Sequence, residues 1–455
     1  MSGETIAAIS TPVAVGGIAI VRISGERAIE IAQKVFKSHR GISLERMKTY
    51  TAAYGRVFDG DVPLDECIAL LFKAPKSYTG EDVVELSTHG GIYVMRRLLA
   101  VLIKAGARLA EPGEFTRRAF LSGRLDLTSA EAVMDIISAR GKAAARAGAA
   151  QHSGALFKKV QLIKEELIDI ASDISAYIDF PEEDLPQLET PVLRARLSEI
   201  ADKLDIYINS FEKGRLILEG VDTVIAGCPN VGKSTLMNLL AGAEKSIVTE
   251  IPGTTRDIVE ESVTFAGIVL KLADTAGLRE GTNVIERIGV ERARARIQAA
   301  QLVFAVFDAS RPLEKEDTEL LEVISVQPAI VILNKADLVS QIDEEYIRTK
   351  NQHVVKISAL NGNGIQELEE IVKELTGANS LDASDGFIAN DRQLECALRA
   401  YEGVSAAVTA IDDGITLDAV STGVEQAMLS LAELTGERAT DEILERVFSK
   451  FCIGK

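Results

Sequence analysis

Eight consecutive residues near the middle of the 455-residue chain have the types and spacing of a phosphate-binding loop: Gly227-Cys228-Pro229-Asn230-Val231-Gly232-Lys233-Ser234. The glycines allow backbone N–H groups to close around phosphate oxygens. The ammonium of Lys233 can reach the β- and γ-phosphates, and the hydroxyl of Ser234 can bind Mg²⁺. An apolar run before the loop predicts a buried strand, and the residues from Thr235 onward predict a helix whose N-terminus attracts phosphate. We therefore predict a nucleoside triphosphate site with contacts from Asn230 to Thr235.

Four further motifs follow in the order used by small GTPases. They are Gly253-Thr254-Thr255-Arg256-Asp257, Asp274-Thr275-Ala276-Gly277, Asn334-Lys335-Ala336-Asp337 and Ser358-Ala359-Leu360. A threonine hydroxyl, assigned to Thr255, can complete the Mg²⁺ shell, Asp274 can hold the ion through water, and the Gly277 N–H can meet the γ-phosphate. The Asp337 carboxylate can accept two hydrogen bonds from guanine, and adenine lacks that pair of donors. Five motifs in order predict that the nucleotide is GTP.

One position departs from the common GTPase pattern. Many GTPases place a Gln directly after the DxxG motif to orient the attacking water, whereas this chain has Leu278, which has no polar side-chain atom. Either hydrolysis is slow or another group supplies the function. The polar residues close by are Arg279, Glu280, Glu286 and Arg287, and a solvated charged loop is an equally good interpretation of them.

Composition restricts the function classes. Hydrophobic residues make up 47% of the chain, and the length favours two or three domains. No apolar run is long enough to span a membrane, and the start of the chain is not basic. The four cysteines lie far apart, which argues against a metal site or a disulfide framework and predicts a cytoplasmic location without membrane attachment. The formal net charge of −18 indicates that any contact with RNA needs a local basic patch or a partner protein.

Hydrophobic patterning predicts a multidomain fold. Residues 1–118 mix short apolar runs with helical segments and predict a compact α+β domain, and residues 119–219 are mainly helical. Residues 220–378 alternate strand-like and helix-like segments, as expected for an α/β domain with a parallel sheet. Residues 379–455 are helical again. We therefore expect an inserted α/β P-loop GTPase domain within a discontinuous all-α helical domain built from both flanks.

The chain resembles the MnmE (TrmE) family of tRNA uridine-modification GTPases of bacteria and organelles, and the resemblance covers essentially its whole length. Outside the GTPase motifs it rests on Gly16-Gly17-Ile18-Ala19-Ile20-Val21-Arg22-Ile23-Ser24-Gly25, Ser77-Tyr78-Thr79-Gly80-Glu81-Asp82-Val83-Val84-Glu85, Pro112-Gly113-Glu114-Phe115-Thr116 and the terminal Phe451-Cys452-Ile453-Gly454-Lys455. That terminal pentapeptide is highly specific to the family.

The resemblance implies a folate-binding N-terminal domain that holds a tetrahydrofolate one-carbon donor, as a 5-formyl- or methylene derivative. By motif, the folate contacts fall on Arg22, Glu85, Arg124 and Lys455. A carboxylate such as Glu85 can accept hydrogen bonds from a pterin's amino and ring N–H groups. Many relatives have Lys at position 124, and Arg keeps the charge but changes the donor geometry. Without the family, surface salt bridging would be the better interpretation of Arg22 and Arg124.

For the GTPase domain the resemblance implies activation by K⁺ and GTP-dependent contact between two such domains in a homodimer. The implied K⁺ ligands are Asn230, Thr249, Ile251 and Thr254, and the nucleotide contacts extend over Thr249-Glu250-Ile251-Pro252-Gly253-Thr254-Thr255. A cation there would neutralise charge in the transition state, in the place of an arginine finger. The family's water-orienting acid corresponds to Glu286, which with Lys233 forms the expected catalytic pair.

The implied activity is GTP hydrolysis within a heterotetramer with an FAD-dependent MnmG (GidA-type) partner. The complex would modify C5 of the wobble uridine, position 34, of certain tRNAs to carboxymethylaminomethyluridine. Two alternatives stay open: a ribosome-assembly switch without modification chemistry, and a folate enzyme with a regulatory GTPase. Cys452 is either a nucleophile near Lys455 or a small buried hydrophobe, and His89 fits best in a local structural hydrogen bond.

Overall fold

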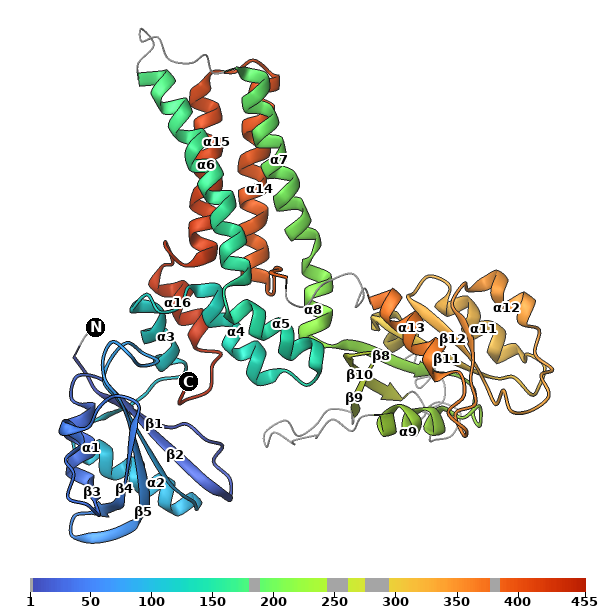
Figure 1. Cartoon of the computed structure of the whole chain (residues 1–455). Helices are drawn as coiled ribbons and strands as arrows, with labels where there is room; N and C mark the ends of the chain where they lie inside the picture. The colour runs from blue at the N-terminus through green and yellow to red at the C-terminus, as the bar shows by residue number, and fades with distance from the viewer. Residues whose placement is uncertain (1–2, 180–188, 244–260, 275–293, 377–384) are drawn as a thin grey trace. The chain divides into compact units, whose positions relative to one another are not determined.

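The computed structural model describes residues 3–179, 189–243, 261–274, 294–376 and 385–455, and the chain forms two compact units (Figure 1). The first unit comprises residues 1–134 and 428–455, and the second comprises residues 135–427. Helices α4 (Leu127–Ser138) and α15 (Leu417–Thr435) contribute residues to both units. Each unit is described by itself.

A seven-stranded sheet in the order β3-β4-β5-β6-β2-β1-β7 forms the body of the first unit. Its neighbouring strands are antiparallel except for the parallel pair β1 and β7. The strands are β1 (Ile6–Ile9), β2 (Gly16–Ser24), β3 (Phe36–Ser38), β4 (Thr51–Asp59), β5 (Val62–Phe72), β6 (Val83–Gly90) and β7 (Arg108–Leu109). Alternate residues such as Val21, Ile23 and Leu86 pack with α1 (Ala28–Val35) and α2 (Ile92–Lys104) in one buried core. The residues between them, Arg22 and Glu85 included, therefore lie on the opposite face of the sheet.

The first unit is completed by short helices from both ends of the chain. They are the 3₁₀ turn η1 (Leu44–Arg46), α3 (Glu114–Leu121) and α16 (Asp441–Phe448). Leu127 of α4 packs with Leu444, Phe448 and Phe451, so the residues just before the C-terminus are anchored in a small hydrophobic core. Residues 452–455 follow directly from Phe451.

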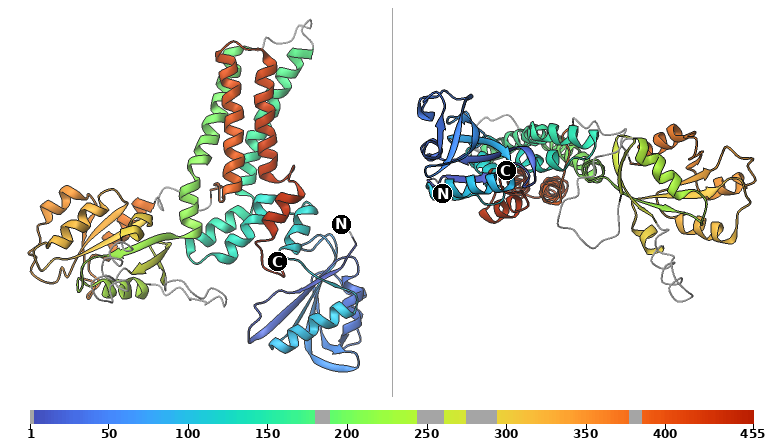
Figure 2. Two further views of the ribbon diagram at one scale, coloured as in Figure 1. Left: turned by 180° about the vertical axis from the view of Figure 1, so that it is seen from behind. Right: turned by 90° about the horizontal axis from the view of Figure 1, so that it is seen from below.

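Helices from both sides of the GTPase motifs pack together in the second unit. They are α5 (Lys142–His152), α6 (Ala155–Asp179), α7 (Thr190–Asn209), α8 (Phe211–Glu219) and α14 (Asp391–Asp412), of which α6, α7 and α14 run side by side (Figures 1 and 2). Arg194 of α7 donates two hydrogen bonds to Asp412 of α14, at 2.6 and 2.9 Å. The alanine-rich stretch 130–150 is not one helix: α4 ends at Ser138 and α5 begins at Lys142.

A six-stranded sheet in the order β13-β12-β11-β8-β10-β9 lies within the second unit, and only the edge pair β9–β10 is antiparallel. The strands are β8 (Val221–Ala226), β9 (Glu261–Phe265), β10 (Ile268–Asp274), β11 (Leu302–Asp308), β12 (Ala329–Asn334) and β13 (Val354–Lys356). One face packs against α9 (Lys233–Ala243) and α13 (Ile365–Thr376), and the other against α11 (Lys315–Ile324) and α12 (Glu344–Lys350). The predicted multidomain fold, with an α/β domain inserted between helical segments, is confirmed.

Among the described residues, no helix is both long enough and apolar enough to cross a lipid bilayer.

Candidate functional site

The phosphate-binding loop connects β8 to α9 and depends on two close backbone approaches. Gly227 has a φ of +153°, and a Cβ atom there would lie 2.3 Å from the carbonyl oxygen of Val306. Gly232 has a φ of +98°, and a Cβ atom there would lie 2.2 Å from Asn334 Nδ2. Only glycine satisfies both the conformation and the space at these two positions. Asn230 has a φ of +62° and is exposed at the outer side of the loop.

Lys233 is buried in the first turn of α9, and its ammonium faces the loop. Lys233 Nζ donates hydrogen bonds to the carbonyl oxygens of Gly227 at 3.0 Å and Cys228 at 2.9 Å. Ser234 and Thr235 are exposed at the start of the same helix. The N-terminus of α9, the loop amides and Lys233 thus lie together, as phosphate binding requires.

The guanine motif follows β12 and contacts the phosphate loop directly. Asn334 is buried, and its Nδ2 donates to the carbonyl oxygen of Val231 at 2.8 Å, while its Oδ1 accepts from the Ala359 N–H at 2.9 Å. The Ser358 hydroxyl donates to Asp337 Oδ1 at 2.6 Å. Asp337 and Leu360 are exposed. The structure therefore brings the first, fourth and fifth motifs together at the carboxyl ends of β8 and β12.

Three polar residues beside these loops were missed at the level of sequence. Asp308, the last residue of β11, lies 2.5 Å from Lys335 Nζ. Asp317 is buried in the first turn of α11, where its Oδ2 forms an ion pair with Arg311 at 2.8 Å and its Oδ1 accepts from the Cys228 thiol at 3.1 Å. Burial and the neighbouring Asp317 raise the pKa of Cys228 to about 12, so this thiol stays protonated at neutral pH. The available sequence signal was an acidic residue directly after the apolar run 302–307, since catalytic and binding residues concentrate where parallel strands end.

Several predicted contacts lie outside the described residues. These are Thr249, Glu250, Ile251, Pro252, Gly253, Thr254, Thr255, Thr275, Ala276, Gly277 and Glu286. Asp274 is the last residue of β10, next to β8 in the sheet.

In the first unit, Arg22 and Glu85 form an ion pair on the sheet face that α1 and α2 leave open. The antiparallel register of β2 and β6 places them directly opposite each other. Arg22 Nε and Nη2 both lie 2.8 Å from Glu85 Oε1. Among the described residues, Glu85 Oε2 has no hydrogen-bond partner. The Arg22 guanidinium also lies 5.6 Å from the ring centroid of Phe115.

The C-terminal tail lies against this pair. Arg22 Nη1 donates to the Gly454 carbonyl oxygen at 3.4 Å, and the Ser10 hydroxyl donates to the same oxygen at 3.3 Å. The Phe115 N–H donates to the Lys455 carbonyl oxygen at 3.2 Å. Gly454 has a φ of +98°, and a Cβ atom there would lie 2.4 Å from the Ile9 carbonyl oxygen. The last residues of the chain thus pack against β1, β2 and the start of α3.

Tyr78 and Arg124 belong to the same part of the unit. Tyr78 Oη lies 3.0 Å from Thr116 Oγ1. Burial raises the pKa of Tyr78, while the hydrogen bond to Thr116 and the positive charges of Arg22 and Arg124 act in the opposite direction. All four residues assigned to folate, Arg22, Glu85, Arg124 and Lys455, therefore lie around β2, β6 and α3.

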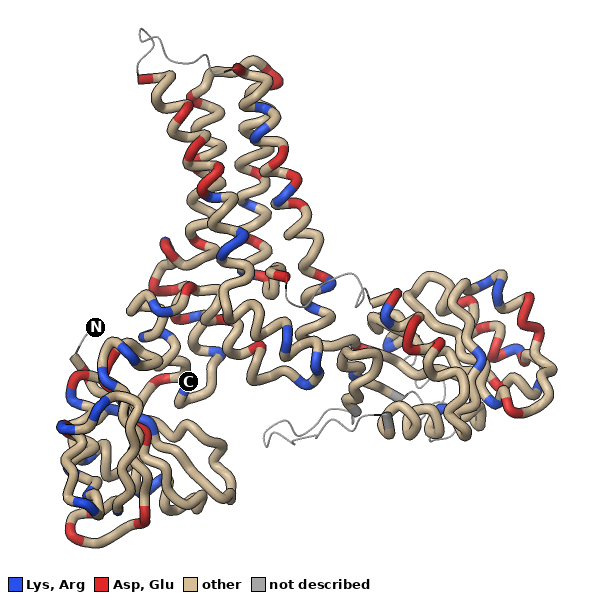
Figure 3. The backbone as a smooth tube through the Cα atoms, in the orientation of Figure 1, with Lys and Arg blue, Asp and Glu red and all other residues tan. Residues whose placement is uncertain are grey.

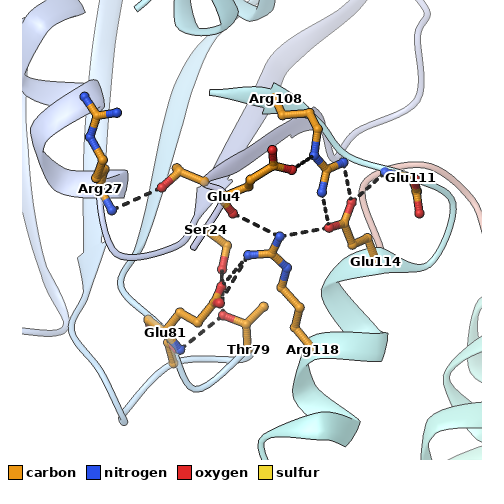
Figure 4. Close-up of polar contacts among 11 residues, drawn as sticks. Glu4, Ser24, Arg27, Thr79, Glu81, Arg108, Glu111, Glu114 and Arg118 are labelled. Carbon is orange, nitrogen blue, oxygen red and sulfur yellow. Dashed lines mark hydrogen bonds and ion pairs between the residues drawn. The ribbon is translucent and has the colours of Figure 1, made fainter. Parts of the chain in front are cut away.

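An ion-pair network joins α3 to the sheet (Figure 4). Arg118 donates to Glu81 Oε1 and Oε2 at 3.1 and 3.0 Å, to Glu114 Oε1 at 2.8 Å and to the Glu4 carbonyl oxygen at 3.0 Å. Arg108 donates two further bonds to Glu114, at 2.7 and 3.1 Å. Burial disfavours the Glu114 charge, but these hydrogen bonds outweigh it and hold the pKa of Glu114 below its ordinary value. The network positions the start of α3, whose backbone holds the tail.

The two undecided residues are now placed. Cys452 is exposed, so its interpretation as a small buried hydrophobe is wrong: it has no core to fill at the tip of the tail. His89 Nδ1 lies 2.8 Å from Asp65 Oδ1, and the His89 N–H donates to Asp65 Oδ2 at 2.8 Å. The neighbouring carboxylate raises the pKa of His89. His89 thus makes the local hydrogen bond expected of it.

The glycine-rich loop before α9 and the Asn334–Asp337 loop, on a mainly parallel sheet with helices on both faces, define the second unit's α/β domain as a P-loop GTPase domain. Residues 5–124 match the family model described as GTP-binding protein TrmE N-terminus, and residues 127–452 match the MnmE helical domain. The chain is 39% identical to the tRNA modification GTPase MnmE of Clostridioides difficile (strain 630) over 455 residues, which cover 99% of each chain. It is 41% identical over 457 residues to the protein of that name from Thermoanaerobacter pseudethanolicus, again covering 99% of both.

Among solved structures, the G domain of the T. maritima FeoB iron transporter is 30% identical over 34% of this chain and 98% of that chain, with a TM-score of 0.27. The chain belongs to the MnmE family of tRNA modification GTPases and is a GTP hydrolase.

Proposed function

We propose that this GTPase acts with an FAD-dependent MnmG partner, as a heterotetramer, on the wobble uridine of certain tRNAs. The product would be the C5 carboxymethylaminomethyl nucleoside, with a tetrahydrofolate derivative as the one-carbon donor. The single observation that carries the folate part is the Arg22–Glu85 pair with the C-terminal tail packed on it. Membership of the family supports the tRNA part.

The donor set of the first unit fits a reduced folate. Glu85 keeps one carboxylate oxygen without a partner among the described residues, so it can accept hydrogen bonds from a pterin's amino and ring N–H groups. Arg22 is paired with Glu85 and would contact the same end of the ligand, while Arg124 and Lys455 supply further positive charge. When bound, the folate would supply the one-carbon unit, and these residues would bind and orient it.

The phosphate loop fits a monovalent cation as well as a nucleotide. Asn230 is exposed at the outer side of the loop, and its side-chain amide has no partner in the described part of the chain. An amide oxygen is a suitable ligand for a hard cation such as K⁺. We assign K⁺ to Asn230, Thr249, Ile251 and Thr254, and Mg²⁺ to Ser234 and Thr255. The cation would neutralise charge that develops during phosphoryl transfer, Lys233 would bind the phosphates and Glu286 would orient the attacking water.

Contact with tRNA requires a local arrangement or a partner, because the formal net charge of the chain is −18. In Figure 3, Lys and Arg residues are interspersed with Asp and Glu along the elements of both units. This pattern favours contact with tRNA through a partner protein. In the proposed complex the MnmG partner and a homodimer of this chain would together hold the tRNA, and GTP turnover would open and close the paired GTPase domains.

Nucleoside analysis of tRNA from a deletion strain tests the proposal. Position 34 should lack the C5 group, and the wild-type gene should restore it. The same strain carrying Arg22→Ala should lack the group although its GTP hydrolysis is retained, because Arg22 lies in the other unit. An unchanged position 34 in the deletion strain would refute the proposal and favour a ribosome-assembly switch.

A further inference from the structure

An ion pair connects Lys335, in the 334–337 loop that carries the guanine motif, to Asp308, a residue outside the five GTPase motifs. Asp308 ends β11, and the parallel register places it beside Asn334, which ends β12. Asp308 Oδ2 lies 2.5 Å from Lys335 Nζ, and the side chains are 11% and 34% exposed. Asp308 Oδ1 accepts from the Ser310 N–H at 2.9 Å and from the Ser310 hydroxyl at 2.6 Å. Burial opposes the charge, but these hydrogen bonds outweigh it and lower the pKa of Asp308, so the ion pair is complete at neutral pH.

Lys335 needs such an attachment because its backbone is strained. It has a φ of +65°, in the left-handed region that residues other than glycine rarely adopt. Strain of this kind persists only where the surroundings hold it, and it concentrates at binding sites. Lys335 stands directly between the buried Asn334 and the exposed residues Ala336 and Asp337. The ion pair therefore acts on the segment that carries the Asp337 carboxylate.

Several other contacts of the 334–337 loop lead to the phosphate loop or to residues 357–359. Asn334 contacts Val231 and Ala359, and Asp337 accepts from Ser358. The Ala336 N–H donates to the Ile357 carbonyl oxygen at 3.0 Å. Two contacts instead reach the end of β11, a strand that contributes no residue to the five motifs: the Ala309 N–H donates to the Asn334 carbonyl oxygen at 2.9 Å, and the Asp308 side chain pairs with Lys335.

We propose that Asp308 is a positioning residue for guanine recognition, which holds Lys335 so that the 334–337 loop presents the Asp337 carboxylate to the base. The inference rests on the guanine contact of Asp337. A preorganised loop slows nucleotide release more than it changes association. Because the loop faces the base, the loss of Asp308 should affect GDP and a GTP analogue equally.

Stopped-flow release of fluorescent GDP and of a fluorescent non-hydrolysable GTP analogue from the full-length protein tests the proposal. Asp308→Asn should speed the release of both nucleotides about five- to tenfold, as expected for the loss of a partly buried ion pair. Ser310→Ala is the matched control, since it removes a neighbour of the other carboxylate oxygen, and its release rate should stay within about twofold of wild type. Lys335→Met, which keeps most of the side-chain length, should reproduce Asp308→Asn.

A double-mutant cycle separates positioning from general stability. If Asp308 acts through Lys335, the double variant should release GDP no faster than Lys335→Met alone. Additive effects of the two substitutions would overturn the proposal, and so would a wild-type release rate for Asp308→Asn or an effect confined to the GTP analogue. Failure of both Asp308→Asn and Asp308→Ala to fold would also overturn it, because the carboxylate would then support the strand end. The guanine contact itself is judged separately, by the base preference of Asp337→Asn.

Discussion

Replacement of Gly454 by alanine should release the C-terminal tail from the first unit. Gly454 has a φ of +98°, and the new Cβ atom would lie 2.4 Å from the Ile9 carbonyl oxygen and 3.2 Å from Ser10 Cα. Both neighbours are backbone atoms, at the end of β1 and in the residue that follows it. Because the sheet holds these atoms in place, the tail has to move away from them. Movement breaks the hydrogen bonds that Arg22 and Ser10 donate to the Gly454 carbonyl oxygen.

The size of the effect follows from these contacts. A left-handed conformation costs a residue other than glycine roughly 1–2 kcal/mol, and the two long hydrogen bonds together contribute about 1 kcal/mol. The total of about 2–3 kcal/mol corresponds to a roughly 30- to 150-fold shift from docked to undocked tail.

Release of Lys455 by a carboxypeptidase specific for basic residues measures this shift without any folate, because cleavage follows the population of the open tail. Gly41→Ala is the matched control in the same unit: its φ is +66°, but nothing lies within 4 Å of the added Cβ atom. We expect Lys455 to be released far faster from Gly454→Ala than from Gly41→Ala, and calorimetry should show weaker binding of 5-formyltetrahydrofolate to the former. GTP hydrolysis should be unchanged in both. Equal release of Lys455 from the two variants would refute the docking of the tail.

The remaining predictions concern the nucleotide and the stability of the first unit. Asp337→Asn should shift the base preference from guanine to xanthine, measured by competition between GDP and XDP, and a retained preference for GDP would count against the carboxylate contact. Hydrolysis should be much faster in K⁺ than in Na⁺ at equal ionic strength, and equal rates would contradict the proposed K⁺ site at Asn230. Glu286→Ala should slow hydrolysis with little loss of GTP affinity. A normal single-turnover rate would show that Glu286 does not orient the attacking water. Glu114→Gln should destabilise the first unit by about 2 kcal/mol at pH 7. Because the folded-state pKa of Glu114 is lowered, this contribution is complete above its ordinary value of 4.5 and disappears as the pH falls through the folded-state pKa. Thermal unfolding at pH 7 and below pH 4 measures it, and a difference between wild type and Glu114→Gln that persists at low pH would contradict the assignment.

Much of the fold was predictable because its signals are local in the chain. The strand before Gly227, Val221–Ala226, appears where the apolar run before the phosphate loop predicts it. The alanine-rich stretch 130–150 was less predictable, since alanine favours helix all along it, whereas the structure has two helices that end at Ser138 and begin at Lys142.

The nucleotide site likewise has a part that the sequence predicts and a part that it does not. Its five motifs are contiguous, so backbone conformation and residue type within four to eight positions are enough to recognise them. The ion pairs that support the motifs are not contiguous. Asp308 meets Lys335, 27 positions away, and Cys228 meets Asp317, 89 positions away, because strands β8, β11 and β12 are neighbours in the sheet.

The sequence by itself determined that this protein binds a nucleoside triphosphate, that the base is guanine and that the chain has several domains, because each of these conclusions depends on residues close together in the chain. Only the tertiary structure decided which residues share a surface. Arg22 meets Glu85, 63 positions away, through the antiparallel register of β2 and β6, and meets Gly454, 432 positions away, because the C-terminal residues pack against the first strands. Such contacts form when distant apolar faces are buried together, and burial depends on the whole fold and not on any one segment.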